Sequence, residues 1–526
     1  MRRLFILGID GATFDVMKPW VSEGHLPNFA RLFDEGCHAV MQSSTPPLSP
    51  VAWTSIATGV NPGKHGIYDF VTGSPTEGTD LPTFSFATGR DRKTKAFWEI
   101  FSELDRPSIV VNMPASYPPD PVNGLMISGW DATQEKMKAF HPEGLYEEIM
   151  AECGDYCMTP LDLISKATML RRDAASMEKL GQATIKSAQQ RRKVMRYLAT
   201  RHPWDVFFGV FTETDVVQHR FWDTVGSSDL SKNVIFQIYR EVDLFVEYLL
   251  SEFGDDIDIM VVSDHGFRSM SASVDLDLYL QQQGFLSRRS PPAASLRAMA
   301  RRCTRVLLPV VRRLGIAPRP KSAAVKPRHT TIERQNSRVF FEGKYPYFYV
   351  LPPNKAEDLL PELQESMMSL RYGDDRVFKK VVPAAEVFWG PYVNDMPDIV
   401  GIMNEQFSVS GAGILMAQRR KKEIFGDHIW NGIHAPNGIF MFKGEGAEKG
   451  QLDTINVFDV APTILSRSGI DIPNEMDGKP VQGVITSRET KYNDYNIYKD
   501  PEAAGAKLSD DDESELRDRL AALGYL

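Results

Sequence analysis

Four short runs of apolar residues, rich in branched side chains, recur along the chain. They are "LFILGI" (4–9), "SIVVNMP" (108–114), "WDVFFGVFTETD" (204–215) and "DIDIMVVSDHGF" (256–267). Continuous apolar runs of this length are typical of strands buried on both faces of a parallel sheet. Segments with helical spacing precede the last three, at 96–104, 174–201 and 233–253. This alternation predicts an α/β fold with a doubly wound, mostly parallel sheet.

The pattern changes between residues 276 and 426, where a basic segment rich in Pro, Ala and Arg is followed by short mixed elements. We expect an inserted cap subdomain there. The core then resumes with "HAPNGIFMFKG" (434–444) and "INVFDVAPTILSRSGI" (455–470), a strand and then a helix. The predicted organisation is therefore core residues 1–275, an inserted cap at 276–426, more core at 427–485 and a tail at 486–526.

The tail is expected to end in a short helix. Ser509 could cap it, acidic residues fill its first turn, and Gly524 would stop it. Its apolar face would be formed by Leu516, Leu520 and Leu523.

Composition narrows the class of protein. A net charge of −9 over 526 residues gives no reason to expect specific nucleic-acid binding. Four cysteines are too few for a disulfide framework in a chain of this size, so a reducing compartment is favoured, with Cys153 and Cys157 as structural thiols. The first apolar run stops at Asp10, too short for a signal peptide or a membrane span. We therefore expect a cytoplasmic protein.

Positive charge is concentrated at 288–328, and no acidic residue lies between Asp277 and Glu333. Within this segment "LRAMARRCTRVLLPVVRRLGI" (296–316) has apolar residues at helical spacing with arginines between them. The favoured interpretation is a helix that packs its apolar face in the cap and exposes its arginines, which makes this surface positive. The alternative is weak contact with an anionic membrane surface.

The stretch "LSPVAWTSIATGVNPGKHGI" (48–67) places Ser49 directly before Pro50. One interpretation is a helix N-cap, with proline in the first turn, where it is favoured. The other is a hydroxyl nucleophile presented at the start of a helix. Both remain open until other residues give Ser49 a chemical role.

Polar residues that could supply that role follow the apolar runs. In open α/β sheets ligands bind at the carboxyl ends of the strands, where Asp10, Asp215 and the pair Asp264-His265 are expected. His219 stands four residues after Asp215, on the same face of a helical turn. His434, in "GIHAPNG", precedes another strand. Individually, a strand-end Asp is usually a cap and a DxxxH pair is usually solvated. Together, three carboxylates, three imidazoles and one hydroxyl suit two borderline metal ions such as zinc or manganese.

With these residues in this order, the chain resembles the alkaline phosphatase superfamily, and within it the type I phosphodiesterase/nucleotide pyrophosphatase branch. The resemblance covers the first 130 residues with "NMPASYPPDPVNGLMISGW", residues 204–267, and 434–481 with "PNEMDGKPV". It implies an alkaline phosphatase fold and two divalent metal ions, zinc in preference to manganese. One metal would be held by Asp10, Asp264, His265 and Ser49, and the other by Asp215, His219 and His434.

The same resemblance makes Ser49 the nucleophile, with Thr54 and Ser55 as packing or capping hydroxyls. His428 is the close rival of His434 as a ligand. His65, in "GKHGI", is expected to fix the loop after the nucleophile helix, and Lys64 is a weaker candidate for contact with substrate charge. In nucleotide pyrophosphatases an asparagine usually stands three residues after the nucleophile, whereas this chain has Ala52, so the resemblance does not extend to nucleotide specificity.

The activity implied is hydrolysis of a small phosphate ester, with phosphodiester or pyrophosphate cleavage ranked first. A metal-activated Ser49 would attack phosphorus and form a phosphoseryl intermediate, which metal-bound water would hydrolyse. Alternatives in the superfamily are a phosphomonoesterase, a phosphonate hydrolase and a phosphomutase. A different class is a metal-bearing binding module without turnover.

Overall fold

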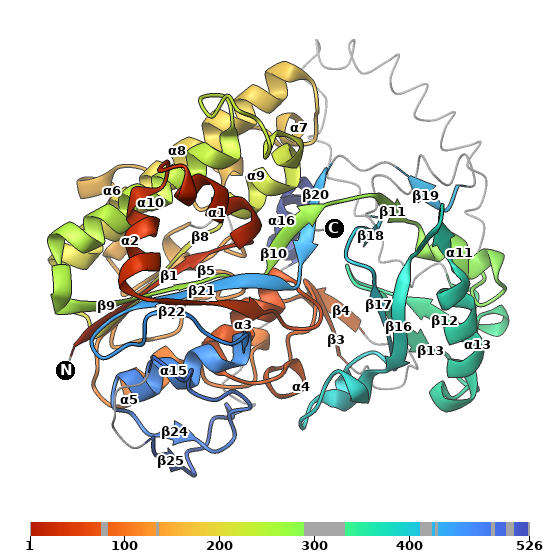
Figure 1. Ribbon diagram of the computed structural model, residues 1–526. Helices are drawn as coiled ribbons and strands as arrows, with labels where there is room; N and C mark the ends of the chain where they lie inside the picture. The colour runs from red at the N-terminus through yellow and green to blue at the C-terminus, as the bar shows by residue number, and fades with distance from the viewer. Residues whose placement is uncertain are drawn as a thin grey trace, which may run out of the picture.

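A ten-stranded sheet forms the centre of the computed structural model, which describes residues 2–74, 83–132, 136–288, 332–410, 423–426, 430–484, 490–500 and 510–523 (Figure 1). The strands lie side by side in the order β22 (Gly450–Gln451), β2 (Cys37–Gln42), β21 (Asn437–Lys443), β9 (Ile257–Val262), β1 (Arg3–Ile9), β8 (Val206–Phe211), β5 (Ser108–Met113), β6 (Gly124–Ser128) and β7 (Phe140–His141), and β23 (Ile455–Asn456) pairs with β2.

The four apolar runs form the parallel centre of this sheet, as predicted. β1 pairs in parallel with both β8 and β9, and β5 pairs in parallel with β8 and β6. β21 is antiparallel to both β9 and β2. β2 therefore runs in the same direction as the central strands, and its carboxyl end reaches the same edge of the sheet.

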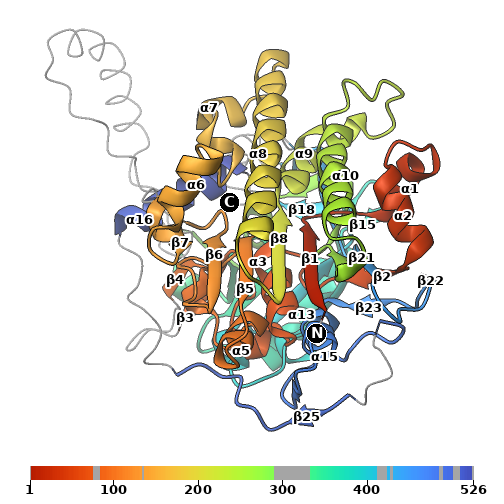
Figure 2. The same ribbon diagram turned by 90° about the vertical axis from the view of Figure 1, so that its left-hand side faces the viewer.

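Helices cover both faces of the sheet, which makes the fold doubly wound. Side chains of β1 alternate between two apolar cores: Phe5, Leu7 and Ile9 belong to one, and Leu4 and Ile6 to the other. The first core is closed by α1 (Phe14–Ser22), α2 (Pro27–Glu35), α6 (Leu145–Cys153), α8 (Ala174–Arg201) and α10 (Val234–Glu252). The second is closed by α3 (Ser49–Thr58), α5 (Phe97–Glu103) and α15 (Val460–Arg467). Figure 2 shows α8 and α10 standing along one side of the strands.

The segment 332–410, here called the insert, builds a second sheet with its own apolar core. Its four antiparallel strands lie in the order β12 (Val339–Phe341), β13 (Tyr347–Val350), β17 (Ile399–Met403) and β16 (Phe378–Pro383). α13 (Ala356–Ser369) packs on β16, and α11 (Leu276–Gln282) contributes to the same core. Figure 1 shows this part beside the central sheet. The boundaries expected at 276, 427 and 486 remain predictions.

Short strands connect the insert to the core. β10 (Gly266–Ser269) pairs with β20 (Gly432–Ala435), and β11 (Ala272–Val274) lies between β18 (Phe407–Val409) and β19 (Phe425–Gly426). Smaller two-stranded sheets are β3 (Val71–Ser74) with β4 (Thr83–Phe86), β14 (Arg371–Tyr372) with β15 (Asp375–Arg376), and β24 (Ile472–Pro473) with β25 (Tyr492–Asn493).

The predicted tail helix is present as α16 (Asp510–Leu523), and it contacts α7 (Lys166–Met169) and β4. Its three leucines, Leu516, Leu520 and Leu523, are buried in the first core, as expected from their spacing. Ser509 and Gly524, and the whole basic helix expected at 296–316, lie outside the described residues. In the described part of the chain no helix has the length and apolar character needed to cross a membrane.

Candidate metal centre

All seven residues predicted from the sequence meet at the carboxyl edge of the central sheet. They are Asp10 after β1, Ser49 at the start of α3, Asp215 and His219 on α9 (Glu213–Phe221) after β8, Asp264 and His265 after β9, and His434 on β20. All are buried or partly buried. Strands far apart in the sequence bring them together because their parallel carboxyl ends share one edge.

Two groups of possible ligand atoms lie within this site. In the first, the ligand atoms of Asp215, His219 and His434 all lie within 4.8 Å of one another. In the second, the same holds for Asp10, Asp215 and His265. The first group matches the expected composition of one metal site. The second contains Asp215 together with Asp10 and His265, so Asp215 is common to both groups. Asp264 also lies at this position, with Oδ2 3.2 Å from His265 Nε2.

The three histidines present the same ring nitrogen to the centre. Each Nδ1 lies close to a backbone carbonyl: 2.9 Å for His219 and Gly432 O, 3.0 Å for His265 and Gly266 O, and 2.9 Å for His434 and Pro47 O. An Nδ1–H that donates to a carbonyl leaves Nε2 as a lone-pair donor, the arrangement typical of metal-bound histidine. The three Nε2 atoms are therefore oriented to bind cations.

Ser49 is the first residue of α3, and Leu48, not Ser49, is the N-cap. No side chain caps this helix, so the N-cap interpretation of Ser49 is wrong. Ser49 Oγ instead lies 3.2 Å from His265 Nε2 and 3.5 Å from Asp10 Oδ1. Proline at the second helical position is tolerated because that N–H needs no partner in the helix. The local sequence thus starts a helix and leaves the hydroxyl turned to the candidate ligands.

Three buried carboxylates stand close together in the centre. Burial raises the pKa of Asp10 well above its usual range, and the charges of Asp264 and Asp215 raise it further. Burial likewise raises the pKa of Asp264 to about 7. For Asp215 burial acts in the same direction, but the charges and hydrogen bonds of His219 and His434 hold its pKa well below the usual range. This concentration of negative charge favours cations at the site.

The histidines show the complementary effect, since burial lowers the pKa of both His219 and His265. Neutral imidazole is the form that binds metal. In addition, Asp264 Oδ2 is buried and lies 3.2 Å from His265 Nε2, which carries no hydrogen when Nδ1–H donates to Gly266 O, so no described residue donates a hydrogen bond to this oxygen. Buried carboxylate oxygens without donors are costly unless a cation is present. The residues therefore fit divalent metal ions.

Two tryptophans that support the centre were not anticipated from the sequence. Trp53 donates from Nε1 to Asp10 Oδ2 at 3.1 Å, and the ring of Trp430 stacks on His219 at 3.8 Å between centroids. Each stands four residues from a predicted site residue, Trp53 after Ser49 and Trp430 before His434. For Trp53 the i,i+4 spacing on a helix was the available signal. The neighbouring backbone is fixed by Thr214, whose hydroxyl donates to Asp10 O at 2.6 Å.

The other candidates have structural roles. Thr54 donates to Pro50 O at 2.6 Å, and Ser55 Oγ lies 3.0 Å from His65 Nε2. His65 Nδ1 accepts from the backbone N–H of Ile67, so this histidine fixes the loop after α3, as expected. Lys64 Nζ donates to Asp477 Oδ1 at 2.8 Å. The rival ligand His428 lies outside the described residues.

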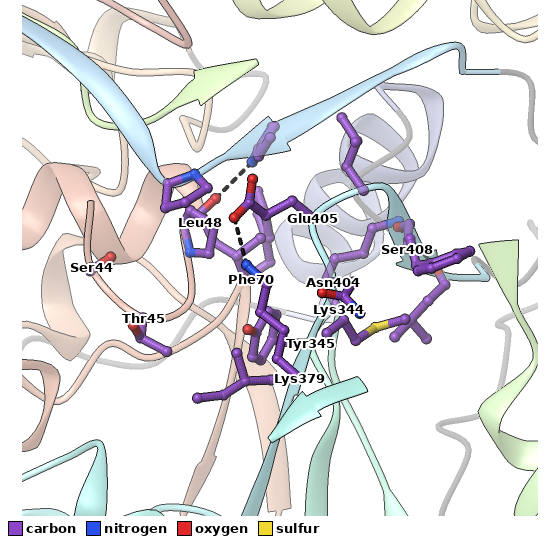
Figure 3. Close-up of a pocket in the computed structure, with 18 of the residues that line it drawn as sticks. Ser44, Thr45, Leu48, Phe70, Lys344, Tyr345, Lys379, Asn404, Glu405 and Ser408 are labelled. Carbon is purple, nitrogen blue, oxygen red and sulfur yellow. Dashed lines mark hydrogen bonds and ion pairs between the residues drawn. The ribbon is translucent and has the colours of Figure 1, made fainter. Parts of the chain in front are cut away.

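A cavity of about 260 Å³ opens beside the centre, between the core and the insert. His219 and His434 line one part of it, together with Leu48, the residue before Ser49. Figure 3 shows Ser44, Thr45 and Leu48 on one side and Asn404 and Ser408 of the insert on the other. A ligand held at the centre would therefore extend between the two sheets.

Solved structures with a similar fold are enzymes of phosphorus chemistry. A phosphonoacetate hydrolase from Sinorhizobium meliloti 1021, in complex with phosphonoformate, matches with a TM-score of 0.56 at 13% identity, over 88% of this chain and 94% of that one. Human ectonucleotide pyrophosphatase/phosphodiesterase 5 matches with a TM-score of 0.51 at 11% identity, over 91% and 97%. The murine protein of the same name gives 0.50 at 12%, over 89% and 95%. At these identities the likeness shows a shared fold.

A comparison with curated protein sequences found no match. The family model described as type I phosphodiesterase/nucleotide pyrophosphatase, by contrast, matches residues 4–431. This match spans most of the chain and includes every predicted site residue except His434. The chain therefore belongs to the type I phosphodiesterase/nucleotide pyrophosphatase family and is a metal-dependent hydrolase.

Proposed function

We propose that the protein hydrolyses small phosphate esters, phosphodiesters first, through nucleophilic attack by Ser49 at a two-metal centre. The position of the Ser49 hydroxyl carries this proposal: Oγ lies within 3.5 Å of both His265 Nε2 and Asp10 Oδ1, at a buried helix start. A serine that only caps the helix would turn its hydroxyl toward the backbone N–H groups of the first helical turn, and Ser49 does not make that contact.

One cation would be held by Asp215, His219 and His434. The other cation would be held by Asp10 and His265, and Asp264 and Ser49 lie next to these two residues. Zinc is the proposed metal, with manganese as the alternative, because imidazole and carboxylate together suit both. When bound, such cations lower the pKa of a serine hydroxyl and stabilise the negative charge of a departing oxygen.

The chain's own residues then perform the displacement. Asp10 Oδ1, 3.5 Å from Ser49 Oγ, can accept a hydrogen bond from this hydroxyl and orient its oxygen, while His265 Nε2, whose other ring nitrogen faces Gly266 O, would serve as a metal ligand. A bond forms from Ser49 Oγ to phosphorus and the ester P–O bond breaks, which leaves phosphoserine and the free alcohol. Attack by water on phosphoserine then releases phosphate or a phosphate monoester and restores Ser49. Trp53 holds Asp10 in position during both steps.

The compartment proposed is the cytoplasm, where thiols stay reduced. All three described cysteines, Cys37, Cys153 and Cys157, are free and buried. The weak membrane contact considered for 288–328 remains a proposal of second rank.

The test compares Ser49→Ala with the unmodified chain, each supplied with Zn²⁺ or Mn²⁺. Release of 4-nitrophenolate from bis(4-nitrophenyl) phosphate and from 4-nitrophenyl phosphate should be lost in Ser49→Ala, while metal content stays near the unmodified value. Ser55→Ala, on the same helix but bonded to His65, should retain turnover. Near-normal turnover by Ser49→Ala would refute the role of Ser49. No turnover by the metal-loaded unmodified chain on any ester would favour a binding module.

A further inference from the structure

The cavity beside the metal centre has walls from two separate parts of the chain. The core contributes Leu48 and Phe70, together with His219 and His434. The insert contributes residues of β17 and β18, among them Ile402, Met403, Phe407 and Val409. Since Leu48 adjoins Ser49, one substituent of a phosphoryl group held at the centre would point into this cavity.

Most of the wall surface is apolar, and several of its polar side chains already have protein partners. Ser44 donates to Pro46 O at 2.7 Å, and the Asn404 amide donates to Arg376 O at 2.6 Å. Lys379 Nζ donates to Glu405 Oε1 at 2.6 Å (Figure 3).

The other oxygen of Glu405 is also engaged, since Arg268 of β10 donates to Oε2 at 2.8 Å. Lys344 Nζ lies over the ring of Trp430, 4.8 Å from its centroid. A ligand rich in hydroxyl groups would give up hydrogen bonds to water and meet groups already engaged, which costs affinity. An apolar ligand would instead contact the apolar lining and remove its remaining exposed surface, that of Ile402 above all, from water, which is favourable.

The size of the cavity suits a compact substituent. Sites for drug-sized ligands typically occupy about 300–1,000 Å³, and this one measures about 260 Å³. An apolar cavity of about 150 Å³ can hold benzene. One aromatic ring with small substituents therefore fits the available space.

We infer that this cavity selects phosphate esters that carry a compact apolar substituent, such as a single aromatic ring, over esters of a nucleoside. The inference rests on the proposed function and names its class of substrate. Selectivity comes from the insert, through the apolar side chains of β17 and β18, and the metal centre supplies the site of reaction.

The first experiment uses three diesters with the same leaving group, 4-nitrophenolate, and a different second substituent: methyl, phenyl or thymidine-5′-yl. Because the leaving group is constant, differences in kcat/KM report on the second substituent. Phenyl is expected to exceed methyl by about tenfold or more, and to exceed thymidine. Equal values for phenyl and methyl, or a preference for thymidine, would overturn the inference while leaving hydrolysis established.

Two variants locate the preference in the cavity. Ile402→Ala should lower the phenyl-to-methyl ratio several-fold, and Phe407→Leu should lower it less. The matched control is Ile424→Ala, a half-buried isoleucine beside the insert core that does not line the cavity, and it should leave the ratio unchanged. An unchanged ratio in Ile402→Ala and Phe407→Leu would contradict the assignment of selectivity to these walls.

A binding measurement separates this inference from the proposed function. Calorimetric titration of the metal-loaded protein with phenylphosphonate and with methylphosphonate needs no turnover. Phenylphosphonate is expected to bind about tenfold tighter or better. A phenyl preference in binding without turnover on any ester would refute the hydrolysis and leave the cavity assignment standing. Equal binding without turnover would refute both.

Discussion

Arg191 of α8 and Glu213 of α9 form an ion pair in which both side chains are fully buried, with Arg191 Nη2 3.0 Å from Glu213 Oε1. Ser187 donates to the same oxygen at 2.6 Å, and the backbone carbonyl of Met158 accepts from the guanidinium at 3.1 Å. Glu213 is the first residue of the helix that carries Asp215 and His219. The pair thus fixes the start of this helix against α8.

Removing one partner should be strongly destabilising. Glu213→Ala leaves the Arg191 guanidinium buried without a carboxylate, and such a loss costs about 3–5 kcal/mol. We expect this decrease in the free energy of unfolding in urea, together with weaker metal binding. The double variant Arg191→Met with Glu213→Leu should recover part of the stability, because an apolar pair of similar size replaces the buried charges, while Ser187 and the Met158 carbonyl lose their partners.

A surface pair provides the control for this comparison. Lys232 and Asp229 also form an ion pair, at 3.0 Å, but lie in solvent. Asp229→Asn should leave the unfolding free energy unchanged within error. A Glu213→Ala protein as stable as Asp229→Asn would contradict the role given to the buried pair.

Asp215 belongs to both groups of candidate ligands, so its loss should affect both metals. Loss of a residue that only supports a ligand lowers metal affinity about 10–100-fold, and loss of a shared ligand should exceed this. After dialysis, Asp215→Asn should retain less than one metal per chain by elemental analysis, and His434→Ala about one. His202→Ala, a partly exposed histidine paired with Glu148, should retain the unmodified content. Full metal content in Asp215→Asn would refute the shared role.

Much of the fold could be predicted because strands that are buried on both faces consist of continuous apolar runs, which are visible in the sequence. The runs at 4–9, 204–215 and 256–267 are apolar on both faces, and each became a central parallel strand. The tail helix followed from the spacing of its leucines. The register and partners of the insert could not be predicted, since its strands are short and pair only through contacts distant in the sequence.

The candidate site was predictable for a similar reason. Residues that follow parallel strands must meet at one edge, so Asp10, Asp264 and His265 converge without further information. The role of Trp430 was not predictable, because its stacking on His219 depends on how β20 lies against α9. The sequence also could not predict which ligands bind which metal. Asp215 belongs to both groups of possible ligands because of its position in the folded structure, which its place in the chain does not reveal.

His65 should make the folded protein sensitive to acid. Burial, followed by the charge of Arg92, lowers its pKa from about 6.5 to about 3. The unfolded chain therefore binds a proton at this residue between those values while the folded chain does not. Stability should fall as the pH decreases through this window, by up to about 1.4 kcal/mol per pH unit from this group.

The variant His65→Gln has no titrating group at this position. Its unfolding free energy should therefore depend less steeply on pH between about 6 and 4 than that of the unmodified protein, in urea titrations at several pH values. His25→Gln, an exposed histidine, should keep the unmodified slope. Parallel slopes for His65→Gln and the unmodified chain would contradict a neutral, buried His65.

Gly63, in α4 (Pro62–His65), allows the insert to approach the loop after the nucleophile helix. A Cβ at this position would lie 2.5 Å from Trp389 O and 2.9 Å from Trp389 N. The backbone of Gly63 also binds Tyr392, whose N–H donates to Gly63 O at 3.0 Å. Nearby, the N–H of Trp389 donates to the side-chain oxygen Oδ1 of Asn61 at 3.1 Å. This contact fixes the insert to the core near the nucleophile.

Gly63→Ala should therefore destabilise the protein although alanine favours a helix. The helical preference contributes at most about 1 kcal/mol, whereas forcing a methyl group into packed backbone costs about 1–3 kcal/mol. The control is Gly226→Ala, where a Cβ meets nothing within 4 Å and should be neutral or slightly stabilising. Urea unfolding of both variants measures this difference in the free energy of unfolding. Equal stability of the two variants would contradict a close approach of the Trp389 backbone to residue 63.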